Sequence, residues 1–411
     1  MAEMTGDDVV RTTSSPVVVS ASRPRPQRLA RGVLAVHAHP DDETLSTGAL
    51  LATCAAWGVP ALVVTCTRGE RGEVLALPGT TSEGLAHLEG DGPALAAHRE
   101  RELAAALTAL GGGTPAAITH CYLDTEALAS PASPASPAEL SGGGGSIALR
   151  ASDRSERFED SGMVWVAPGV AGPDPAVPAG FAVVPLDDAA GRLARLIREV
   201  RPSVVATYEA GGGYGHPDHV RAHQVAARAV ALAADPAFDV AAADTADDAT
   251  VPDDAATPDD VTVPDGAAGR GRALVPWAAE LWVRVAAAGE LRRERAALAG
   301  HPGARALADA TGLTFPAAEE ALPPVARDDA AIAALAVAGR VVEVDVAPVL
   351  GDVVAALRAH ATQVQHARAL DPSRDQSPDR RLLGWYALSN GVLAPIGRAE
   401  TYQVVVAAEA P

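Results

Sequence analysis

Two short clusters of histidine and aspartate hold the side chains of this sequence that could do chemistry. The first is His39-Pro-Asp-Asp-Glu43, and the second is Tyr214-Gly-His-Pro-Asp-His219. Imidazole nitrogens and carboxylate oxygens are donors that zinc and similar divalent ions accept. With an open position for water, such an ion assists hydrolysis. The two clusters therefore predict a hydrolytic metal site built from distant stretches of chain.

The spacing gives neighbouring side chains different tasks. His39 and Asp42 can occupy adjacent corners of a metal site, while Asp41 between them can point at metal-bound water. His219 can supply the third ligand and leave room for water. The alternative for the first cluster is an acidic helix start, whose carboxylates complement the helix dipole. Capping alone does not readily explain why a His-Pro-Asp cluster occurs twice.

Each cluster follows a short apolar run that is typical of a buried strand. Residues 33–36 precede the first cluster and residues 202–207 precede the second. Apolar residues at helical spacing follow, from Thr44 and from Val220. Residues 60–65 form another expected strand, which gives a β-α-β unit and a parallel sheet. Open α/β sheets bind ligands at the carboxyl ends of their strands, where these clusters fall.

The rest of the pattern also predicts the α/β fold class. Strands and helices alternate along most of the chain, as expected for a mostly parallel sheet. The further expected helices cover 95–110, 188–199, 287–299, 328–337 and 348–363. The further expected strands cover 118–123, 277–285 and 341–346, and residues 382–406 are mixed.

Composition narrows the class of protein. The chain has 411 residues, 48% of them hydrophobic, and a net charge of −19, which disfavours nucleic acid and anionic membranes as partners. The three cysteines lack metal-type spacing and suggest reduced thiols in the cytosol. No apolar run approaches the length of a membrane span, and the N-terminus lacks a signal-peptide pattern. We therefore expect a cytoplasmic protein.

Four regions are predicted along the chain. Residues 1–29 read as a disordered tail, and residues 30–234 as the metal-binding α/β domain, with a flexible Ser/Pro/Gly insertion at about 126–149. Residues 235–272 read as a disordered acidic insertion, because 235–269 carry ten aspartates and no basic residue. A docking segment is the alternative there. Residues 273–411 are expected to complete the fold and the substrate pocket.

Longer segments around the clusters resemble the LmbE-like, or PIG-L, family of zinc-dependent N-acetylglucosaminyl deacetylases. The resemblance covers most of residues 31–407, apart from the two insertions. The segments that carry it are His39-Pro-Asp-Asp-Glu43-Thr-Leu-Ser, Cys66-Thr-Arg-Gly-Glu-Arg-Gly-Glu73, Arg157-Phe-Glu-Asp-Ser-Gly-Met163, Gly212-Gly-Tyr-Gly-His-Pro-Asp-His219, Arg358-Ala-His-Ala-Thr-Gln363 and Ala387-Leu-Ser-Asn390. The Asp-Ser-Gly-Met and Ala-Leu-Ser-Asn segments favour the branch that acts in mycothiol biosynthesis. The implied fold is a Rossmann-like, mostly parallel sheet with helices on both faces, plus a smaller C-terminal α+β portion.

The resemblance also implies which residues bind the metal and which residue is the base. His39, Asp42 and His219 bind one zinc ion per subunit, and iron(II) suits the same ligands. Asp41 is the general base that takes the proton from water.

Other site residues are implied in the same way. Tyr214 and His216 stabilise the tetrahedral oxyanion, and His216 is also a candidate proton donor to the leaving amine. Asp218 orients His216. The residues implied to line the sugar and inositol pocket are Arg99, Asp160 and Met163.

The expected reaction is hydrolysis of the N-acetyl group of N-acetylglucosaminyl-inositol, which yields acetate and glucosaminyl-inositol. The expected partner is thus a small amino-sugar substrate, and the sequence makes no prediction of oligomeric state. One alternative is an amidase of mycothiol S-conjugates, or another N-acyl amino-sugar deacetylase of the same family. A second alternative, from a different class, is a metal-stabilised sugar-binding module without catalysis.

Overall fold

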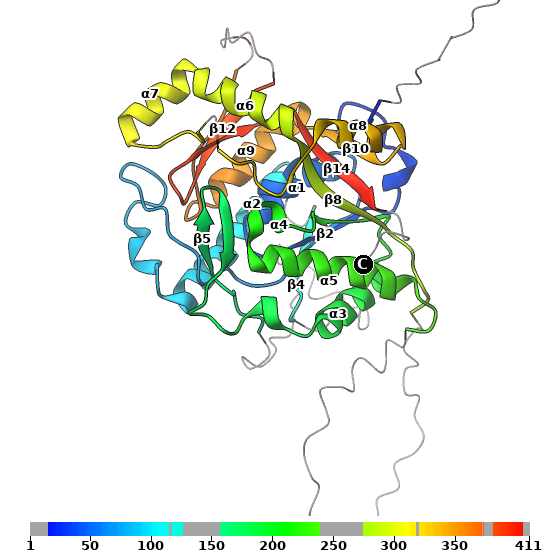
Figure 1. Ribbon diagram of the computed structural model, residues 1–411. Helices are drawn as coiled ribbons and strands as arrows, with labels where there is room; N and C mark the ends of the chain where they lie inside the picture. The colour runs from blue at the N-terminus through cyan, green and yellow to red at the C-terminus, as the bar shows by residue number, and fades with distance from the viewer. Residues whose placement is uncertain are drawn as a thin grey trace, which may run out of the picture.

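One long mixed sheet organises the part of the protein that the computed structural model describes, namely residues 15–114, 117–125, 157–238, 274–317, 320–371, 373 and 381–405. Its strands lie in the order β1-β10-β14-β8-β7-β2-β3-β4, with β9 paired to β8 (Figure 1). These strands are β1 (Val17–Val19), β2 (Val33–His37), β3 (Ala61–Thr65), β4 (Thr119–Tyr122), β7 (Val204–Tyr208), β8 (Glu280–Ala287), β9 (Ala326–Arg327), β10 (Val341–Asp345) and β14 (Ala399–Val405).

The half of the sheet around β2 is parallel, as the alternation of strands and helices predicts. β2 pairs in parallel with β3 on one side and with β7 on the other, and β7 pairs in parallel with β8. All five residues of β2, β3 and β7 are buried, so these strands need apolar side chains on both faces. Beyond β8 the direction changes, because β14 runs antiparallel to both β8 and β10.

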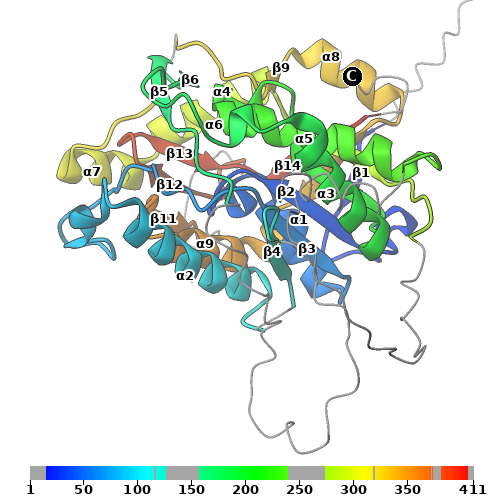
Figure 2. The ribbon, with the colours of Figure 1, turned by 90° about the horizontal axis from the view of Figure 1, so that it is seen from below.

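Helices cover both faces of the sheet. Val33 and Ala35 of β2 face the layer formed by α1 (Asp42–Ala56), α2 (Gly92–Leu110) and α9 (Leu350–Ala359). Leu34 and Val36 face the opposite layer, formed by α3 (Leu186–Val200) and α5 (Pro217–Ala234). The two layers lie on either side of the sheet in Figure 2. The alternation of side chains along β2 thus divides the core into two apolar clusters.

Two small antiparallel sheets complete the described structure. β11 (Val364–Ala369), β12 (Gly384–Leu388) and β13 (Leu393–Ile396) form one, and the hairpin β5 (Met163–Ala167) and β6 (Val170–Pro173) forms the other. The remaining helices are α4 (Gly212–Gly215), α6 (Ala288–Gly300), α7 (Pro302–Thr311), α8 (Asp329–Val337) and the 3-10 turns η1 (Gln27–Leu29), η2 (Leu85–Leu88), η5 (Phe181–Val183) and η7 (Ala347–Val349). The α/β class, with a central mostly parallel sheet, is confirmed.

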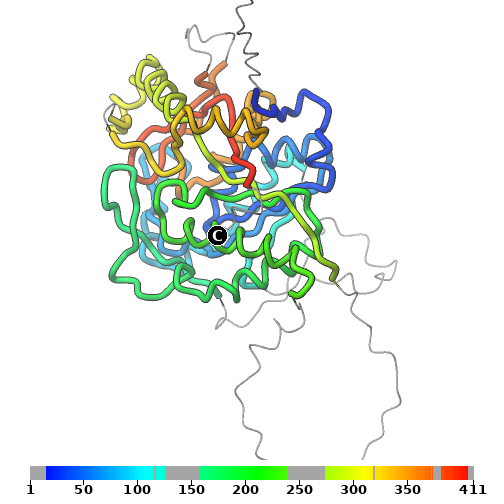
Figure 3. The backbone as a smooth tube through the Cα atoms, turned by 45° about the vertical axis from the view of Figure 1, so that its right-hand side comes forward, coloured from blue at the N-terminus to red at the C-terminus, as the bar shows by residue number. Residues whose placement is uncertain are grey.

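The C-terminal part is more closely joined to the sheet than the sequence indicates. β8, β10 and β14 all lie in the main sheet, while β11, β12 and β13 form the smaller antiparallel portion. In the tube of Figure 3, the N-terminal part of the described chain (blue) and its C-terminal part (red) belong to one body. The division into domains stays a prediction.

Two expectations need correction. The predicted disorder up to residue 29 is wrong for the described part of that tail, because Val17–Val19 pair with β10 and Leu29 is buried. The helix predicted over 348–363 ends at Ala359. Residues 126–149 lie outside the described residues, as does 235–272 apart from its first four residues. Among the described helices, none is both long enough and apolar enough to cross a membrane.

Candidate metal centre and active site

The two histidine–aspartate clusters meet because the strands before them are neighbours. β2 leads into the first cluster and β7 into the second, and the two strands pair directly in parallel. Each cluster begins a helix: Asp41 is the N-cap of α1 and His216 is the N-cap of α5, followed by proline at the first helical position. Adjacent parallel strands therefore bring residues 39–43 and 216–219 to one edge of the sheet.

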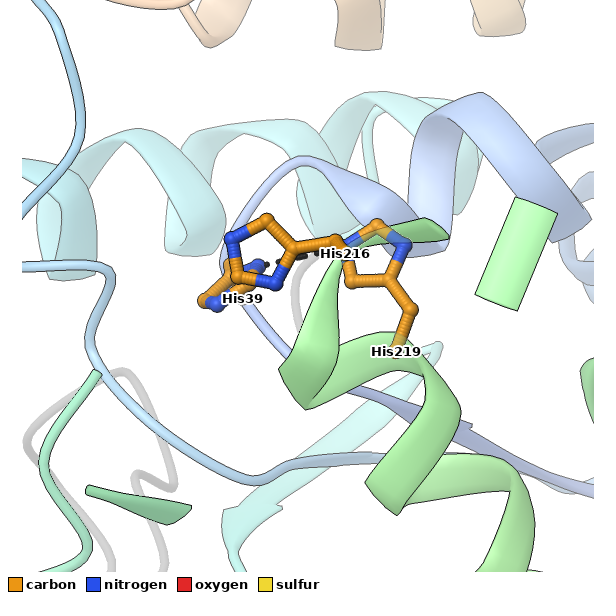
Figure 4. A group of neighbouring side chains, drawn as sticks. All are labelled: His39, His216 and His219. Atoms are coloured by element: carbon orange, nitrogen blue, oxygen red, sulfur yellow. Dashed lines mark hydrogen bonds between the residues drawn. The ribbon is translucent and has the colours of Figure 1, made fainter. Parts of the chain in front are cut away.

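The three predicted ligands form a triangle of donor atoms. His39 Nδ1 and Asp42 Oδ2 are 3.3 Å apart, and His219 Nε2 lies 3.3 Å from each of them. Figure 4 shows the rings of His39 and His219 joined by this short contact. Ligands bound at about 2.0–2.2 Å around a tetrahedral ion are separated by roughly 3.3–3.6 Å. The spacing of the three atoms fits such an ion.

The hydrogen bonds of the two histidines leave the correct nitrogens free for a metal. His39 Nε2 lies 3.2 Å from Asp218 Oδ2, and His219 Nδ1 lies 3.2 Å from the Gly212 carbonyl. Carboxylate and carbonyl oxygens only accept, so these ring nitrogens carry the protons. In the neutral rings, His39 Nδ1 and His219 Nε2 are the nitrogens that carry lone pairs, and a cation between them would bind both.

The charges around the triangle also favour a cation. Burial opposes charge on His39, but the carboxylates of Asp160, Asp218 and Asp42 raise its pKa well above the ordinary value. The pKa of Asp42 is held well below its ordinary value despite burial, because His219 and His39 surround it. Two other trios of donors also converge within 4.8 Å, and they are His39 with His216 and His219, and His39 with Asp160 and Asp218.

Asp41 stands beside the triangle in an unusual backbone conformation. Its φ is 113°, a region that residues other than glycine rarely adopt. Its N–H donates to Glu43 Oε2 at 2.9 Å, and its Oδ2 lies 3.3 Å from Nη2 of Arg99. Burial raises its pKa to about 7, although Arg99 works in the opposite direction. A carboxyl group that titrates near neutrality suits a proton acceptor that later returns the proton.

The carboxylate of Asp218 orients a different histidine from the one predicted. It accepts hydrogen bonds from His39 Nε2 and from the backbone N–H of Ser161, at 3.2 and 2.9 Å. It meets His216 only through its own backbone N–H, which donates to His216 Nδ1 at 3.1 Å. The predicted contact of Asp218 with His216 is thus made by its backbone N–H, while its carboxylate contacts His39. The sequence places Asp218 two residues from His216, but the fold turns its side chain toward His39.

That same contact fixes the form of His216. Because Nδ1 accepts a hydrogen bond, the neutral ring carries its proton on Nε2. Burial and the neighbouring rings of His39 and His219 hold the pKa of His216 well below its ordinary value. A neutral His216 can donate a hydrogen bond to an oxyanion, but it has no extra proton for a leaving amine.

Tyr214 and the three predicted pocket residues line the same cleft as the ligands, which has a volume of 1480 Å³. The ring centroid of Tyr214 is 5.0 Å from that of His219. Arg99 donates to the carbonyls of Gly69 and Pro40 at 2.7 and 2.5 Å, in addition to its contact with Asp41. A Cβ on Gly69 would lie 2.1 Å from Arg99 Nη1, so this close approach requires glycine.

The remaining pocket residues sit on the segment before and within β5. Asp160 accepts from the N–H of Gly162 at 2.8 Å, and its Oδ1 is 3.7 Å from His39 Nε2. Met163 is the first residue of β5. The structure thus brings every predicted site residue except Asp218 to the wall of one cleft, with Asp218 buried directly behind His39.

Three features of the site escape sequence reasoning. Trp165 stacks on Tyr214, with ring centroids 5.8 Å apart, and it is 40% exposed. Tyr208 stacks on His219 at 4.3 Å, and its hydroxyl accepts the N–H of Ala38 at 2.9 Å. His360 is paired with Glu43. The sequence offers a signal for two of them. Trp165 lies two residues after the Asp-Ser-Gly-Met segment, and Tyr208 lies at the end of an expected strand.

Comparison with known proteins gives consistent matches. A model of the PIG-L family, described as GlcNAc-PI de-N-acetylase, matches residues 34–230. The chain is 34% identical over 401 residues to a 1D-myo-inositol 2-acetamido-2-deoxy-alpha-D-glucopyranoside deacetylase of Kineococcus radiotolerans, covering 97% of this chain and 83% of the relative. It is 34% identical over 381 residues to the protein so named from Streptomyces avermitilis, covering 91% and 92%. The N,N'-diacetylchitobiose deacetylase of Pyrococcus horikoshii is 18% identical, with a TM-score of 0.32 over 61% of this chain and 59% of that one.

Proposed function

Because the chain belongs to the PIG-L family of de-N-acetylases and is itself a deacetylase, we propose that its substrate is N-acetylglucosaminyl-inositol. The products are acetate and glucosaminyl-inositol. The observation that carries this substrate assignment is the likeness, over nearly the whole chain, to relatives named for that deacetylation. The triangle of His39, Asp42 and His219 beside Asp41 supports a metal-assisted reaction.

His39, Asp42 and His219 would hold the metal ion, for which we propose zinc, with iron(II) suited to the same donors. When bound, the ion polarises the acetamide carbonyl and lowers the pKa of its water toward about 7. Asp218 keeps Nδ1 of His39 available by holding the proton on Nε2. The Gly212 carbonyl holds the proton of His219 on Nδ1 and so keeps Nε2 available.

The protein's own groups account for the proton transfers. The carboxylate of Asp41 accepts a proton from the attacking water as the C–O bond forms. The N–H of His216 and the hydroxyl of Tyr214 donate hydrogen bonds to the oxyanion that develops. When the C–N bond breaks, protonated Asp41 returns the proton to the amine, because neutral His216 has none to give. Water is thus added across the amide, and Asp41 ends as it began.

Arg99 is proposed to contact the substrate and to hold Asp41, the base, in place. Its guanidinium reaches the cleft, contacts Asp41 and fixes the backbone at Pro40 and Gly69. Asp160 and Met163, which line the same cleft, are proposed to contact the sugar or inositol ring.

The test is an acetate-release assay with three substrates run in parallel. N-acetylglucosaminyl-inositol is expected to release acetate with a kcat/KM well above that of N-acetylglucosamine alone. A mycothiol S-conjugate is the third substrate, and preferential cleavage of that compound would replace the proposal with the amidase alternative. Binding of the acetylated sugar without any release of acetate would favour the sugar-binding module.

Removal of the metal is expected to abolish acetate release. Dialysis of the purified protein against a chelator, followed by metal-free buffer, should leave an inactive protein that recovers on addition of one equivalent of zinc. Elemental analysis before and after dialysis measures the metal content. Full activity in protein that holds no detectable metal would contradict the metal-assisted mechanism.

Asp218→Asn is expected to weaken metal binding by about 10–100-fold, because the charged acceptor behind His39 is lost. A competition titration with a chromophoric chelator measures this affinity. Asp187→Asn is the matched control, since Asp187 is an exposed carboxylate paired with Arg228. Equal affinities in the two variants would show that the Asp218–His39 contact does not support the metal.

A further inference from the structure

A fully buried pair of side chains joins the C-terminal part of the chain to the turn that carries Asp41. His360 Nε2 donates to Glu43 Oε1 at 2.7 Å, and neither side chain is exposed. Glu43 lies in the first turn of α1, while His360 follows directly after α9, 317 positions later. The helix expected over 348–363 stops at Ala359, and the release of His360 from that helix brings its ring to Glu43.

The second oxygen of Glu43 supports the backbone of Asp41. Glu43 Oε2 accepts the N–H of Asp41 at 2.9 Å, while Oε1 accepts from His360 and from the Thr44 hydroxyl. Asp41 needs such support because its φ of 113° is a strained conformation for a residue with a side chain. The direction of the Asp41 carboxylate follows from that backbone conformation.

The metal ligands have separate supports. His39 is held by Asp218, and His219 is held by the carbonyl of Gly212. Asp42 accepts the N–H of His39 at 3.0 Å. Loss of the His360–Glu43 contact would thus act first on Asp41 and leave the ligand triangle in place.

We propose that His360 is a positioning residue for the reaction: it fixes Glu43, and Glu43 holds Asp41 in the conformation that directs its carboxylate at the water. This inference rests on the proposed function only through the role of Asp41 as base. His360 touches neither the ligand triangle nor any atom that reacts, so its effect is expected on turnover. A displacement of about 1 Å at a reacting group can reduce a rate by up to about 10²-fold.

The test compares two amides at position 360. His360→Gln can place an N–H near the position of Nε2 and is expected to keep most of the wild-type kcat. His360→Asn is too short to reach Glu43 and is expected to lower kcat about 10-fold or more, with KM and bound metal unchanged. Both side chains are uncharged amides, so the comparison isolates the hydrogen bond to Glu43.

Further variants keep the test decisive. Glu43→Gln is expected to lower kcat as well, and the double variant with His360→Asn to lose no more than the larger single loss, because both act through one contact. His366→Gln, in the half-buried histidine of β11, is the control that should leave kcat unchanged. If His360→Asn does not fold, kcat and thermal unfolding are compared between His360→Gln and Glu43→Gln instead.

Two results would overturn the proposal. Wild-type kcat in a folded, metal-loaded His360→Asn variant would show that the pair does not position Asp41. A parallel loss of bound metal and of kcat would show that it supports the ligands instead. Both results leave the proposed function standing, whereas absence of acetate release from the wild-type protein would contradict that function and, with it, the role of His360 in the reaction.

Discussion

Asp41→Asn is expected to lower kcat for acetate release by about two to four powers of ten while the metal stays bound. The carboxylate has no place in the triangle of His39, Asp42 and His219, so its loss should not empty the metal site. Asparagine tolerates positive φ about as well as aspartate, so the backbone at φ 113° can persist. The variant therefore removes the proton acceptor and little else.

Steady-state kinetics and elemental analysis of the same preparation measure these two properties. Asp187→Asn, which changes an exposed carboxylate far along the chain, should behave as the wild type in both. Wild-type turnover by Asp41→Asn would remove Asp41 from the role of base. Loss of metal from this variant would instead place Asp41 among the ligands.

His219→Ala is expected to abolish acetate release because the protein no longer retains its metal. The substitution removes one of three donor atoms that lie 3.3 Å from one another. Of the three predicted ligands, His219 alone comes from the second cluster. Without it, the two remaining donors, His39 and Asp42, come from a single turn. Elemental analysis after gel filtration in buffer containing a weak chelator measures the retained metal.

His223→Ala is the matched control, one turn further along α5. Its Nδ1 meets the Tyr208 carbonyl at 2.8 Å, and it is not among the donors that converge on His39. Stoichiometric metal in His219→Ala would overturn the ligand assignment. In that case His216→Ala would be the next variant, because His216 belongs to the alternative trio with His39 and His219.

The local parts of this site could be predicted from the sequence. An apolar run over 33–36, followed by His-Pro-Asp and a helical pattern from Thr44, predicts strand, turn and helix, and the structure has β2 and α1 there. The same reasoning placed β7 and α5 around the second cluster. Parallel pairing then implied that the two turns share an edge of the sheet.

The parts that could not be predicted depend on distant contacts. β1 has only three residues, and its pairing partner β10 begins more than 300 positions later. α9 ends at Ala359, and His360 beyond it contacts Glu43, 317 positions earlier, a contact that a local helical pattern does not contain. Asp218 was assigned to its neighbour in sequence, whereas the fold offers it a histidine 179 positions away. Spacing indicates which side chains can meet, but packing decides which of them do.

The position of β14 has a consequence for how the molecule assembles. It is the last of the described strands along the chain, yet it is inserted between β8 and β10, and β1 joins the sheet only through β10. During synthesis, residues 281–285 of β8 therefore lack their β14 partner until residues 401–405 leave the ribosome. Until then, this unpaired edge of β8 can pair with a strand of another chain.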